Sequence, residues 1–299
     1  MSDFLILGTF DGVHRGHQML LKAAAEQAAA LGMRSHAICF SYPPKFFFSG
    51  RKENCLLTTP HEKQQLLSEL GCNIVEIIDF SRKLSEIPAK RFFDEFLIKD
   101  RAAGGIAAGN DFSFGKDREG NTRLLETFCA VNGIAFLKKD FLLYNEKKIS
   151  SSLIRSFLSE GRLEEAAWCL GRKYNISGKV IHGAGIGRTL GFPTANLETD
   201  TAKLLPPGVY AALAEIDGRR YPSVASIGRR PTLKTMENRL IPEVHLLSFD
   251  GDLYGKTLSL SLCSRIRSEK HFSSKEELIK QISEDKKTAA SSAAAGILN

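Results

Sequence analysis

Short β-rich runs alternate with helical patterns over the first half of this chain, and this alternation constrains the fold more than any other feature. The apolar runs cover residues 4–7, 36–40, 74–78, 106–108 and 134–137. Between them, Thr59, Pro60 and Glu62 form a capping box with proline in the first turn, which predicts a helix running toward Leu70. Strands that alternate with helices form a parallel sheet covered by helices. The sequence therefore predicts a Rossmann-like α/β domain over residues 1–150.

The pattern changes in the second half. Residues 151–172 predict two short helices that bridge the halves. Beyond them, glycine and proline separate short apolar runs, and Leu258, Leu260 and Leu262 alternate with polar residues in the period of a half-buried strand. We therefore expect a small antiparallel β-barrel over residues 173–288, closed by a helix that ends near residue 286. The small, uncharged residues 289–299 predict a disordered tail.

Composition excludes several classes of protein. The chain has 299 residues, 43% of them hydrophobic, and no apolar stretch near the roughly 20 residues needed to cross a bilayer. No basic region precedes the first apolar run, as a secretory signal would require. The six cysteines are scattered without a CxxC pair, which argues against a zinc site or a disulfide framework. We expect a soluble, cytoplasmic protein with no membrane partner.

The net charge of +7 is compatible with nucleic-acid binding or with ligands that carry phosphates. Because the basic residues are dispersed along the chain, the sequence favours phosphate-bearing small molecules, or a solvated surface, over a nucleic-acid partner. It predicts no particular oligomeric state.

The segment FDGVHRGH, residues 10–17, places two imidazoles and a glycine where the first apolar run gives way to a helix. Such a turn directs backbone N–H groups at whatever lies above it, and these groups favour anions. His14 and His17 add donors for a phosphate at that point. The arrangement suits a reaction in which negative charge builds on the α-phosphate of a nucleotide while pyrophosphate leaves. The alternative is two surface histidines in a loop.

The motifs along the chain occur in the order found in the bifunctional riboflavin kinase/FAD synthetases of bacteria, and the chain resembles this family from Leu5 to about Asp285. In the first half the motifs are FDGVHRGH, GNDFSFGKDREG and ISSSLIR. In the second half they are HGAGIGRTLGFPTANL, GVY, IGRRPT, EVHLLSFDGDLYG and IRSEKHF. Each motif alone is a weak signal, whereas the ordered series is a specific one.

For the first half, the resemblance implies a nucleotidyltransferase that transfers AMP from ATP to FMN, with His14 and His17 in its catalytic turn. The FMN phosphate itself attacks the α-phosphorus in line, so the protein mainly positions the two substrates and neutralises the charge of their phosphates. The further nucleotide-binding residues implied by the resemblance are Gly8, Phe10, Gly16, Ser151, Ser152 and Arg155.

Simpler explanations compete with three of these residues and with two residues on the flavin side. Ser151 and Ser152 stand at an expected helix N-terminus, where hydroxyls and N–H groups favour an anion, and Arg155 can add a bidentate contact. A plain helix cap with a solvent-facing arginine is the alternative. Asp111 and Phe112 resemble flavin-binding positions of the family; alternatively, the aspartate caps a turn and the phenylalanine belongs to the core.

For the second half, the resemblance implies a riboflavin kinase barrel that makes FMN from riboflavin and ATP. A glycine-rich turn able to approach phosphates closely has Arg188 as a charge partner. The glycines of this turn are Gly183, Gly185, Gly187 and Gly191. In the family's PTAN motif, Thr194 and Asn196 help to hold Mg²⁺ between the ATP phosphates, in keeping with the preference of magnesium for hard oxygen ligands. A hydroxyl or Asx turn after a strand is the alternative.

Glu243 is the expected general base of the kinase. The primary alcohol of the ribityl chain is a poor nucleophile, and a carboxylate within reach can accept its proton. Because Glu243 follows Pro242 at the start of an apolar run, we expect it at a rim of the barrel, where an ordinary surface glutamate is the alternative. Arg267 is assigned to flavin or nucleotide, with a salt bridge to Glu269 or Asp285 as the alternative.

The chain departs from the family at Ser226, where asparagine is common, at Ser248, where aspartate is common, and in one longer segment. Many relatives carry FxPHP after the second strand, whereas this chain has FSYPPKFFF at residues 40–48, without a histidine.

The leading hypothesis from the whole series of motifs is an enzyme that makes FMN and then FAD. Because of the missing histidine, the first alternative is a riboflavin kinase whose N-terminal module is inactive. A non-catalytic flavin- or RNA-binding regulator is the second alternative, and a different phosphate acceptor for the first half is the third.

Overall fold

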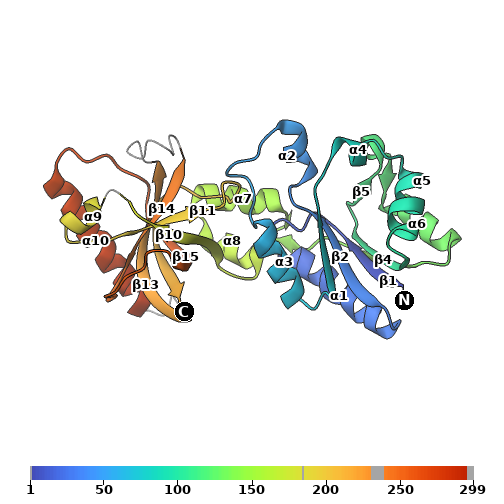
Figure 1. Ribbon diagram of the computed structural model, residues 1–299, viewed down its shortest axis with the longest axis horizontal. Helices are drawn as coiled ribbons and strands as arrows, with labels where there is room; N and C mark the ends of the chain where they lie inside the picture. The colour runs from blue at the N-terminus through green and yellow to red at the C-terminus, as the bar shows by residue number, and fades with distance from the viewer. Residues whose placement is uncertain (1, 184, 230–238, 295–299) are drawn as a thin grey trace. The chain divides into compact units, whose positions relative to one another are not determined.

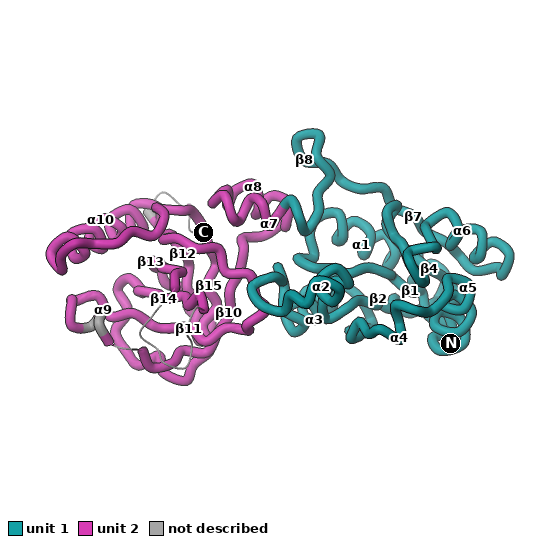
Figure 2. The backbone as a smooth tube through the Cα atoms, turned by 90° about the horizontal axis from the view of Figure 1, so that it is seen from above, with its two compact units in different colours: residues 1–153 teal, residues 154–299 magenta. Residues whose placement is uncertain are grey.

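The computed structural model describes residues 2–183, 185–229 and 239–294. The chain forms two compact units, residues 1–153 and residues 154–299, which Figure 2 distinguishes by colour. The division falls within the helix α7 (Ser151–Glu160), slightly after the boundary at residue 150 expected from the sequence.

Five parallel strands form the sheet of the first unit, in the order β3-β2-β1-β4-β7. Figure 1 labels its central strands β2, β1 and β4. The five strands are β1 (Asp3–Leu7), β2 (Arg34–Phe40), β3 (Ile74–Ile78), β4 (Ala103–Gly109) and β7 (Ala135–Lys139). Each overlaps one of the five apolar runs, so the predicted parallel sheet is confirmed. The strand order reverses direction between β1 and β4, and in such sheets ligands bind beyond the carboxyl ends of the strands at this switch point.

Helices connect these strands and cover both faces of the sheet. They are α1 (Arg15–Ala30), α2 (Pro44–Ser49), α3 (Pro60–Glu69), α4 (Arg82–Ser85), α5 (Ala89–Arg91), the π-helix η1 (Phe92–Lys99), the 3₁₀-helix η2 (Lys116–Arg118) and α6 (Thr122–Val131). The predicted capping box is present, because the Thr59 N–H donates to Glu62 Oε2 at 2.9 Å and the Glu62 N–H donates to Thr59 Oγ1 at 3.2 Å. Two short hairpins complete the unit, β5 (Ser113–Phe114) with β6 (Gly120–Asn121), and β8 (Leu143–Tyr144) with β9 (Lys147–Lys148).

The central strand β1 is buried along its whole length, because helices cover both of its faces. Phe4 and Ile6 pack in one core cluster with side chains of α1 and α3. Leu5 and Leu7 point the opposite way and pack with side chains of η1 and α6. The sheet is thereby held rigidly on both sides, and its carboxyl edge, where the chain leaves β1, β2 and β4, is the edge that carries the polar motifs.

The second unit is a closed antiparallel barrel with the strand order β10-β11-β14-β13-β12-β15, as predicted. Its strands are β10 (Tyr174–Ile181), β11 (Ala195–Thr199), β12 (Gly208–Ile216), β13 (Arg219–Arg229), β14 (Leu240–Leu246) and β15 (Thr257–Arg267). Leu258, Leu260 and Leu262 of β15 are buried in its interior, as their alternation predicted. The helices α7 and α8 (Leu163–Leu170) precede the barrel, and α8 packs on β10 and β15, so it is part of this unit.

The prediction of a disordered tail at residues 289–299 is wrong for the part that the structure describes. The C-terminal helix α10 runs from Lys275 to Ala294, well past the end expected near residue 286. Ala289 is fully buried and packs against Val209 and Ala211 on the outside of the barrel. Alanine is the best helix former, and its small side chain lets the helix lie close to the strands, so a run of small residues extends the helix here. Residues 295–299 lie outside the described residues.

Within the described ranges, no helix combines the length and the apolar character that crossing a membrane would require.

Candidate active sites

The turn that joins β1 to α1 has a strained backbone. Phe10, Gly12 and Val13 have φ angles of 46°, 85° and 40°. The left-handed region is uncommon for residues other than glycine and is an outlier for a β-branched side chain such as Val13. Strain of this kind persists only where surrounding contacts impose it, and it is concentrated at functional sites.

Those contacts come from residues 57 and 58, just before α3. The Asp11 side chain is fully buried and accepts hydrogen bonds from the backbone N–H groups of Leu57 at 2.9 Å and Thr58 at 3.3 Å. In return, the Gly12 N–H donates to Thr58 Oγ1 at 2.9 Å. The aspartate therefore clamps the turn to a segment far away in the sequence, and this stabilises the strained backbone.

His14 caps the N-terminus of α1. Its Nδ1 accepts a hydrogen bond from the His17 N–H at 3.3 Å, and the two imidazole rings stack with centroids 3.5 Å apart. A Cβ at position 16 would lie 3.3 Å from the His14 ring, so glycine lets the ring sit tightly against the first turn. Because Nδ1 is an acceptor, the proton of the neutral His14 ring is on Nε2, where it serves as a donor.

His17 is a neutral imidazole in this site. Burial, followed by the charges of His14, Lys63 and Lys148, holds the pKa of His17 well below its ordinary value. Its ring meets the Phe10 ring edge-on at 5.2 Å, and its Nδ1 is buried without a hydrogen-bond partner among the described residues. A neutral ring in this position is a hydrogen-bond donor or acceptor for a ligand, and it carries no permanent charge.

Gly8 and Phe10 shape the floor of the same turn. A Cβ on residue 8 would lie 2.7 Å from the Phe10 ring, so the ring can fold over the end of β1 only because residue 8 is a glycine. Of the predicted nucleotide-binding residues, these two and Gly16 therefore lie beside the histidine turn.

Lys63 is a site residue that sequence reasoning missed. It is fully buried on α3, and its ammonium group donates to the carbonyl oxygen of Phe40 at the carboxyl end of β2. Burial lowers its pKa, and the nearby Cys39 and Asp11 counteract that effect. The signal in the sequence was a lysine on the apolar stripe of a helix, four residues before the buried Leu67, because such charges are rarely buried without a purpose.

The serines of the second predicted phosphate motif lie at the start of α7. Ser151 Oγ donates to the backbone carbonyl of Asp11 at 2.8 Å, which joins this motif to the histidine turn across 140 positions in the sequence. Ser152 Oγ accepts from Lys45 Nζ at 3.2 Å, and the capping oxygen of the helix belongs to Ser150, which accepts from the Leu153 N–H. Arg155 lies one turn further along α7, beyond the division between the units.

Asp111 and Phe112 follow β4 and therefore lie at the same edge of the sheet. The Asp111 carboxylate forms an ion pair with Lys148. Phe112 stacks on Phe114 with ring centroids 5.7 Å apart and packs against the core. The packing matches the alternative in which the phenylalanine is a core residue.

The segment that departs from the family carries aromatic rings in place of a histidine. Phe47 and Phe48 of α2 meet the Phe80 ring edge-on at 5.3 and 5.7 Å, and Phe40 meets it at 5.2 Å. Phe48 is 70% exposed. The carboxyl ends of β2 and β3 therefore present an apolar aromatic surface, which we name the Phe80 cluster (Phe40, Phe47, Phe48, Phe80).

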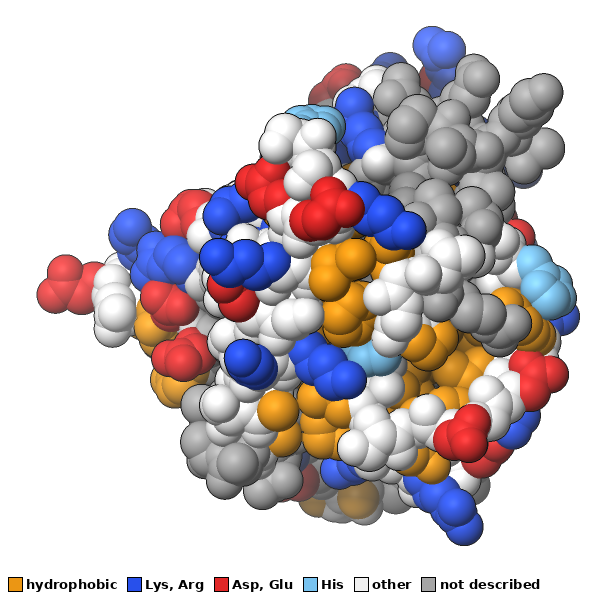
Figure 3. All heavy atoms as spheres, turned by 90° about the vertical axis from the view of Figure 1, so that its left-hand side faces the viewer, with side chains coloured by type: hydrophobic (Ala, Val, Ile, Leu, Met, Phe, Trp, Pro, Cys, Tyr) orange, Lys and Arg blue, Asp and Glu red, His pale blue; other side chains and the backbone are white. Residues whose placement is uncertain are grey.

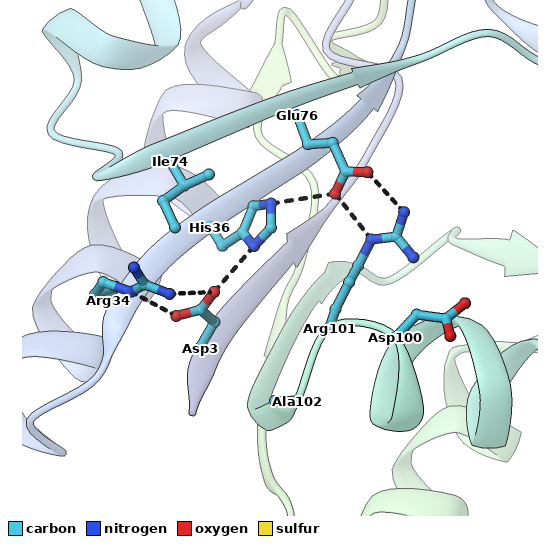
Figure 4. Close-up of a pocket in the computed structure, with 8 residues that line it drawn as sticks. All are labelled: Asp3, Arg34, His36, Ile74, Glu76, Asp100, Arg101 and Ala102. Atoms are coloured by element: carbon cyan, nitrogen blue, oxygen red, sulfur yellow. Dashed lines mark hydrogen bonds and ion pairs between the residues drawn. The ribbon is translucent and has the colours of Figure 1, made fainter. Parts of the chain in front are cut away.

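The opposite edge of the sheet carries a chain of ion pairs around a pocket of about 480 Å³ (Figure 4). Arg34 binds Asp3, and the His36 ring lies between two carboxylates, with Nδ1 3.2 Å from Asp3 Oδ2 and Nε2 3.2 Å from Glu76 Oε2. Glu76 in turn forms a bidentate pair with Arg101 at 2.6 and 2.8 Å. These ion pairs link β1, β2, β3 and the segment before β4, so we assign this edge to stability.

Replacing Glu76 with glutamine should lower the free energy of unfolding by about 1 kcal/mol or more at neutral pH. The hydrogen bond from Arg101 is the largest cause that holds the pKa of Glu76 below its ordinary 4.5. A carboxylate with a depressed pKa stabilises the fold above pH 4.5, and this stabilisation is lost as the pH falls through the folded-state value. Urea unfolding at a series of pH values should show the Glu76→Gln deficit shrinking in acid, whereas exposed Glu69→Gln should show no deficit. A deficit that stays constant down to strongly acidic pH would contradict this assignment.

In the barrel, two glycines allow the loop after β10 to touch the predicted metal ligands. A Cβ at position 183 would lie 2.2 Å from Asn196 Nδ2. A Cβ at position 187, on the short helix α9 (Ile186–Thr189), would lie 2.4 Å from the Phe192 carbonyl oxygen and 2.9 Å from Thr194 Oγ1. The sequence predicted that these glycines let the backbone approach a phosphate. In the structure they let the backbone pack closely against the side chains of Asn196 and Thr194. Gly191 has a φ of 83°, which favours glycine, and the Arg188 side chain lies outside the described atoms.

Asn196 and Glu243 are neighbours on adjacent strands of the barrel. Asn196 of β11 pairs with Glu243 of β14, and Glu243 pairs on its other side with Ser226 of β13. Directly paired residues share a face, and the neighbouring Ala195, Val244 and Ala225 are buried, so the polar row lies on the outer face. The expectation that Glu243 opens its strand is wrong, because β14 begins at Leu240 and places Glu243 in its middle. The ladder thereby holds the carboxylate next to Asn196.

Arg267 is engaged by an acidic partner. Its guanidinium forms a bidentate pair with Asp285 of α10, with Nη2–Oδ2 at 2.8 Å, and both side chains are largely buried. The arginine also lies over the Phe272 ring, 5.7 Å from its centroid. The salt bridge proposed as the alternative for this residue is thus present, and it joins α10 to the end of β15.

Two family models match the chain, a model described as FAD synthetase over residues 2–153 and a model described as riboflavin kinase over residues 170–293. The chain is 36% identical over 286 residues to the bifunctional riboflavin kinase/FMN adenylyltransferase of Escherichia coli strain K12, covering 95% of this chain and 91% of that protein. It is 37% identical over 290 residues to the protein of the same name from Bacillus subtilis strain 168, with 95% and 90% covered.

Among solved structures, a Streptococcus pneumoniae protein titled macrolide-efflux protein superimposes with a TM-score of 0.86 and 29% identity. The match covers 97% of this chain and 94% of that one. The succession of parallel sheet and barrel is therefore shared along the whole length of both chains.

Proposed function

This chain belongs to the family of bifunctional riboflavin kinases/FMN adenylyltransferases, and from this membership we propose that it phosphorylates riboflavin to FMN and then adenylylates FMN to FAD, using one ATP in each step. The observation that supports both steps best is that each unit gathers its own set of motif residues. In the first unit these surround the turn between β1 and α1, and in the second they surround Asn196 and Glu243.

In the first unit, the proposed adenylylation site is the N-terminus of α1. The N–H groups of the first helical turn favour the negative charge of a triphosphate. His14, with its proton on Nε2, and the neutral His17 donate to the phosphate oxygens as charge builds at the α-phosphorus. Ser151 supports the turn from the side through the Asp11 carbonyl. The FMN phosphate attacks in line, and no covalent intermediate on the protein is needed.

The flavin ring requires an apolar surface beside this site. Asp111 and Phe112 follow β4, whereas the Phe80 cluster follows β2 and β3 at the same edge of the sheet. We assign the ring to this edge, with Asp111 as a polar contact. The exposed rings of the Phe80 cluster supply apolar area where the family's histidine is missing.

In the second unit, Glu243 is the proposed general base, which accepts the proton of the ribityl hydroxyl as the hydroxyl oxygen bonds to the γ-phosphorus of ATP and ADP leaves. Thr194 and Asn196 fit a magnesium site, because both offer neutral side-chain oxygens. Gly183 and Gly187 let the loop backbone lie close to these two side chains. When bound with ATP, Mg²⁺ neutralises phosphate charge. Glu243 lies directly opposite Asn196 in the β11–β14 ladder, so a phosphate held near Asn196 would lie beside the proposed base.

The proposed partners are the small molecules ATP, riboflavin and FMN. On the face of the molecule in Figure 3, basic and acidic side chains are interspersed, which favours small ligands over the extended basic stripe that RNA binding uses. The location in the cytoplasm stays a prediction from the sequence.

Product analysis of the purified protein tests this proposal. With riboflavin, ATP and Mg²⁺ we expect FMN to appear first and FAD to follow, and with FMN in place of riboflavin we expect FAD directly. FMN without any FAD would support the alternative of a kinase with an inactive first unit. Binding of flavin or RNA with neither product would support the non-catalytic alternative.

A further inference from the structure

One buried histidine of the barrel has no role in the mechanism above. His245 lies on β14, two residues after Glu243, so both side chains project from the same outer face of the strand. It is only 9% exposed. A polar side chain buried beside a catalytic carboxylate requires a reason, because burial without a hydrogen bond costs free energy.

The contact that His245 makes is specific. Its Nδ1 lies 2.8 Å from the carbonyl oxygen of Pro193. A carbonyl oxygen only accepts, so Nδ1 carries a proton and donates it, whether the ring is neutral or charged. Nε2 is buried and has no hydrogen-bond partner in the described part of the chain. The Pro193 carbonyl is therefore the one polar anchor of this ring among the described residues.

The hydrogen bond between His245 and Pro193 lies at the point where the β11–β14 strand pairing ends. The ladder between β11 and β14 contains two pairs, Ala195 with Val244 and Asn196 with Glu243. One step further in the same register, Thr194 would stand opposite His245, but β11 begins only at Ala195. The imidazole reaches past the end of the ladder and holds the residue before Thr194.

The same segment is supported from its other side. The backbone of Gly187 packs against the Phe192 carbonyl and the Thr194 hydroxyl, at a distance that only glycine permits. The Phe192 ring meets the His245 ring edge-on, with centroids 6.0 Å apart. Residues 192–194 thus contact Gly187 of α9 on one side and His245 on the other, and both contacts constrain the backbone next to Thr194.

We propose that His245 is a positioning residue of the kinase site, which fixes the Pro193 carbonyl and thereby sets the Thr194 hydroxyl and the Asn196 side chain relative to Glu243. This inference rests on the proposed function of the barrel. Residues that hold metal ligands in place typically contribute about 10–100-fold to metal affinity or activity.

Three variants of the full-length chain test the role of the Nδ1–H group: His245→Asn, His245→Gln and His245→Phe. The amide nitrogen of asparagine occupies nearly the position of Nδ1, glutamine places its amide further out, and phenylalanine keeps the ring without a donor. We expect the glutamine and phenylalanine variants to form FMN about 10–100-fold more slowly and to need a higher Mg²⁺ concentration for half-maximal rate. The asparagine variant should retain most of the rate and the Mg²⁺ dependence of the unaltered protein.

Each preparation contains its own control, because adenylylation of supplied FMN depends on the first unit and should be unchanged in all three variants. Thermal unfolding measures any loss of stability separately. Equal losses in the asparagine and glutamine variants, or an unaltered rate and Mg²⁺ dependence in the phenylalanine variant, would overturn the positioning role and leave His245 as packing. If the unaltered protein forms no FMN, the proposed function itself fails, and this inference fails with it.

Discussion

Replacing Glu243 with glutamine is expected to slow FMN formation from riboflavin by about 10²–10⁴-fold. Glutamine preserves the shape of the side chain and its place opposite Asn196 in the ladder, but it cannot accept a proton from the ribityl hydroxyl. The alcohol must then attack while it is still protonated. The measurement is the initial rate of FMN production with saturating ATP and Mg²⁺.

The same variant provides a control in the other unit, because Glu243→Gln should convert supplied FMN to FAD at the normal rate. A matched barrel variant is Glu215→Gln. Glu215 is half-buried on β12 and pairs with Arg220 at 2.8 Å, far from the proposed machinery in the strand register, and its replacement should leave both activities intact. FMN formation by Glu243→Gln at the unaltered rate would remove this residue from the mechanism.

Replacing His14 or His17 with alanine is expected to lower FAD formation from FMN by about 10²–10³-fold for each histidine. Both rings lie at the N-terminus of α1, stacked on each other, and each supplies a donor for charge that develops only in the transition state. His14 also caps the helix, so His14→Ala should cost about 1 kcal/mol of stability that His17→Ala does not. The measurement is the initial rate of FAD production from FMN and ATP.

In both histidine variants the conversion of riboflavin to FMN should be unchanged, since the barrel carries its own nucleotide site. His61→Ala is the matched control, because His61 is exposed on α3 in the same unit. An unaltered protein that forms no more FAD than the double variant His14→Ala/His17→Ala would establish the alternative in which the first unit is inactive.

Sequence periodicity predicted the elements well where the pattern was local. The apolar runs of the first half became the five parallel strands, and the box at Thr59 and Glu62 formed with both hydrogen bonds. It failed at the C-terminus, where the small residues at 289–294 predicted a disordered tail but belong to the helix α10 in the structure. Their helix is stabilised by packing of Ala289 on the barrel, and a contact with distant strands leaves no mark in the local pattern.

The site residues divide in the same way. His14, His17, Thr194, Asn196 and Glu243 were proposed as site residues because they lie in motifs that resemble those of the family. Lys63 and His245 were not, since each acts on a backbone carbonyl that lies far away in the sequence, Phe40 in one case and Pro193 in the other. Every residue carries a backbone carbonyl, so the sequence does not indicate which carbonyl a buried side chain will contact.

The sequence by itself determined the order of strands and helices, the division into a parallel sheet and a barrel, and the motifs that each carries, because alternation, capping and turn chemistry are properties of neighbouring residues. Only the tertiary structure decided which of these residues meet. The strand order brings the Ser151 hydroxyl to the Asp11 carbonyl, and the closure of the barrel sets Asn196 opposite Glu243. Such pairings depend on how distant strands are registered, which is a property of the packed chain as a whole.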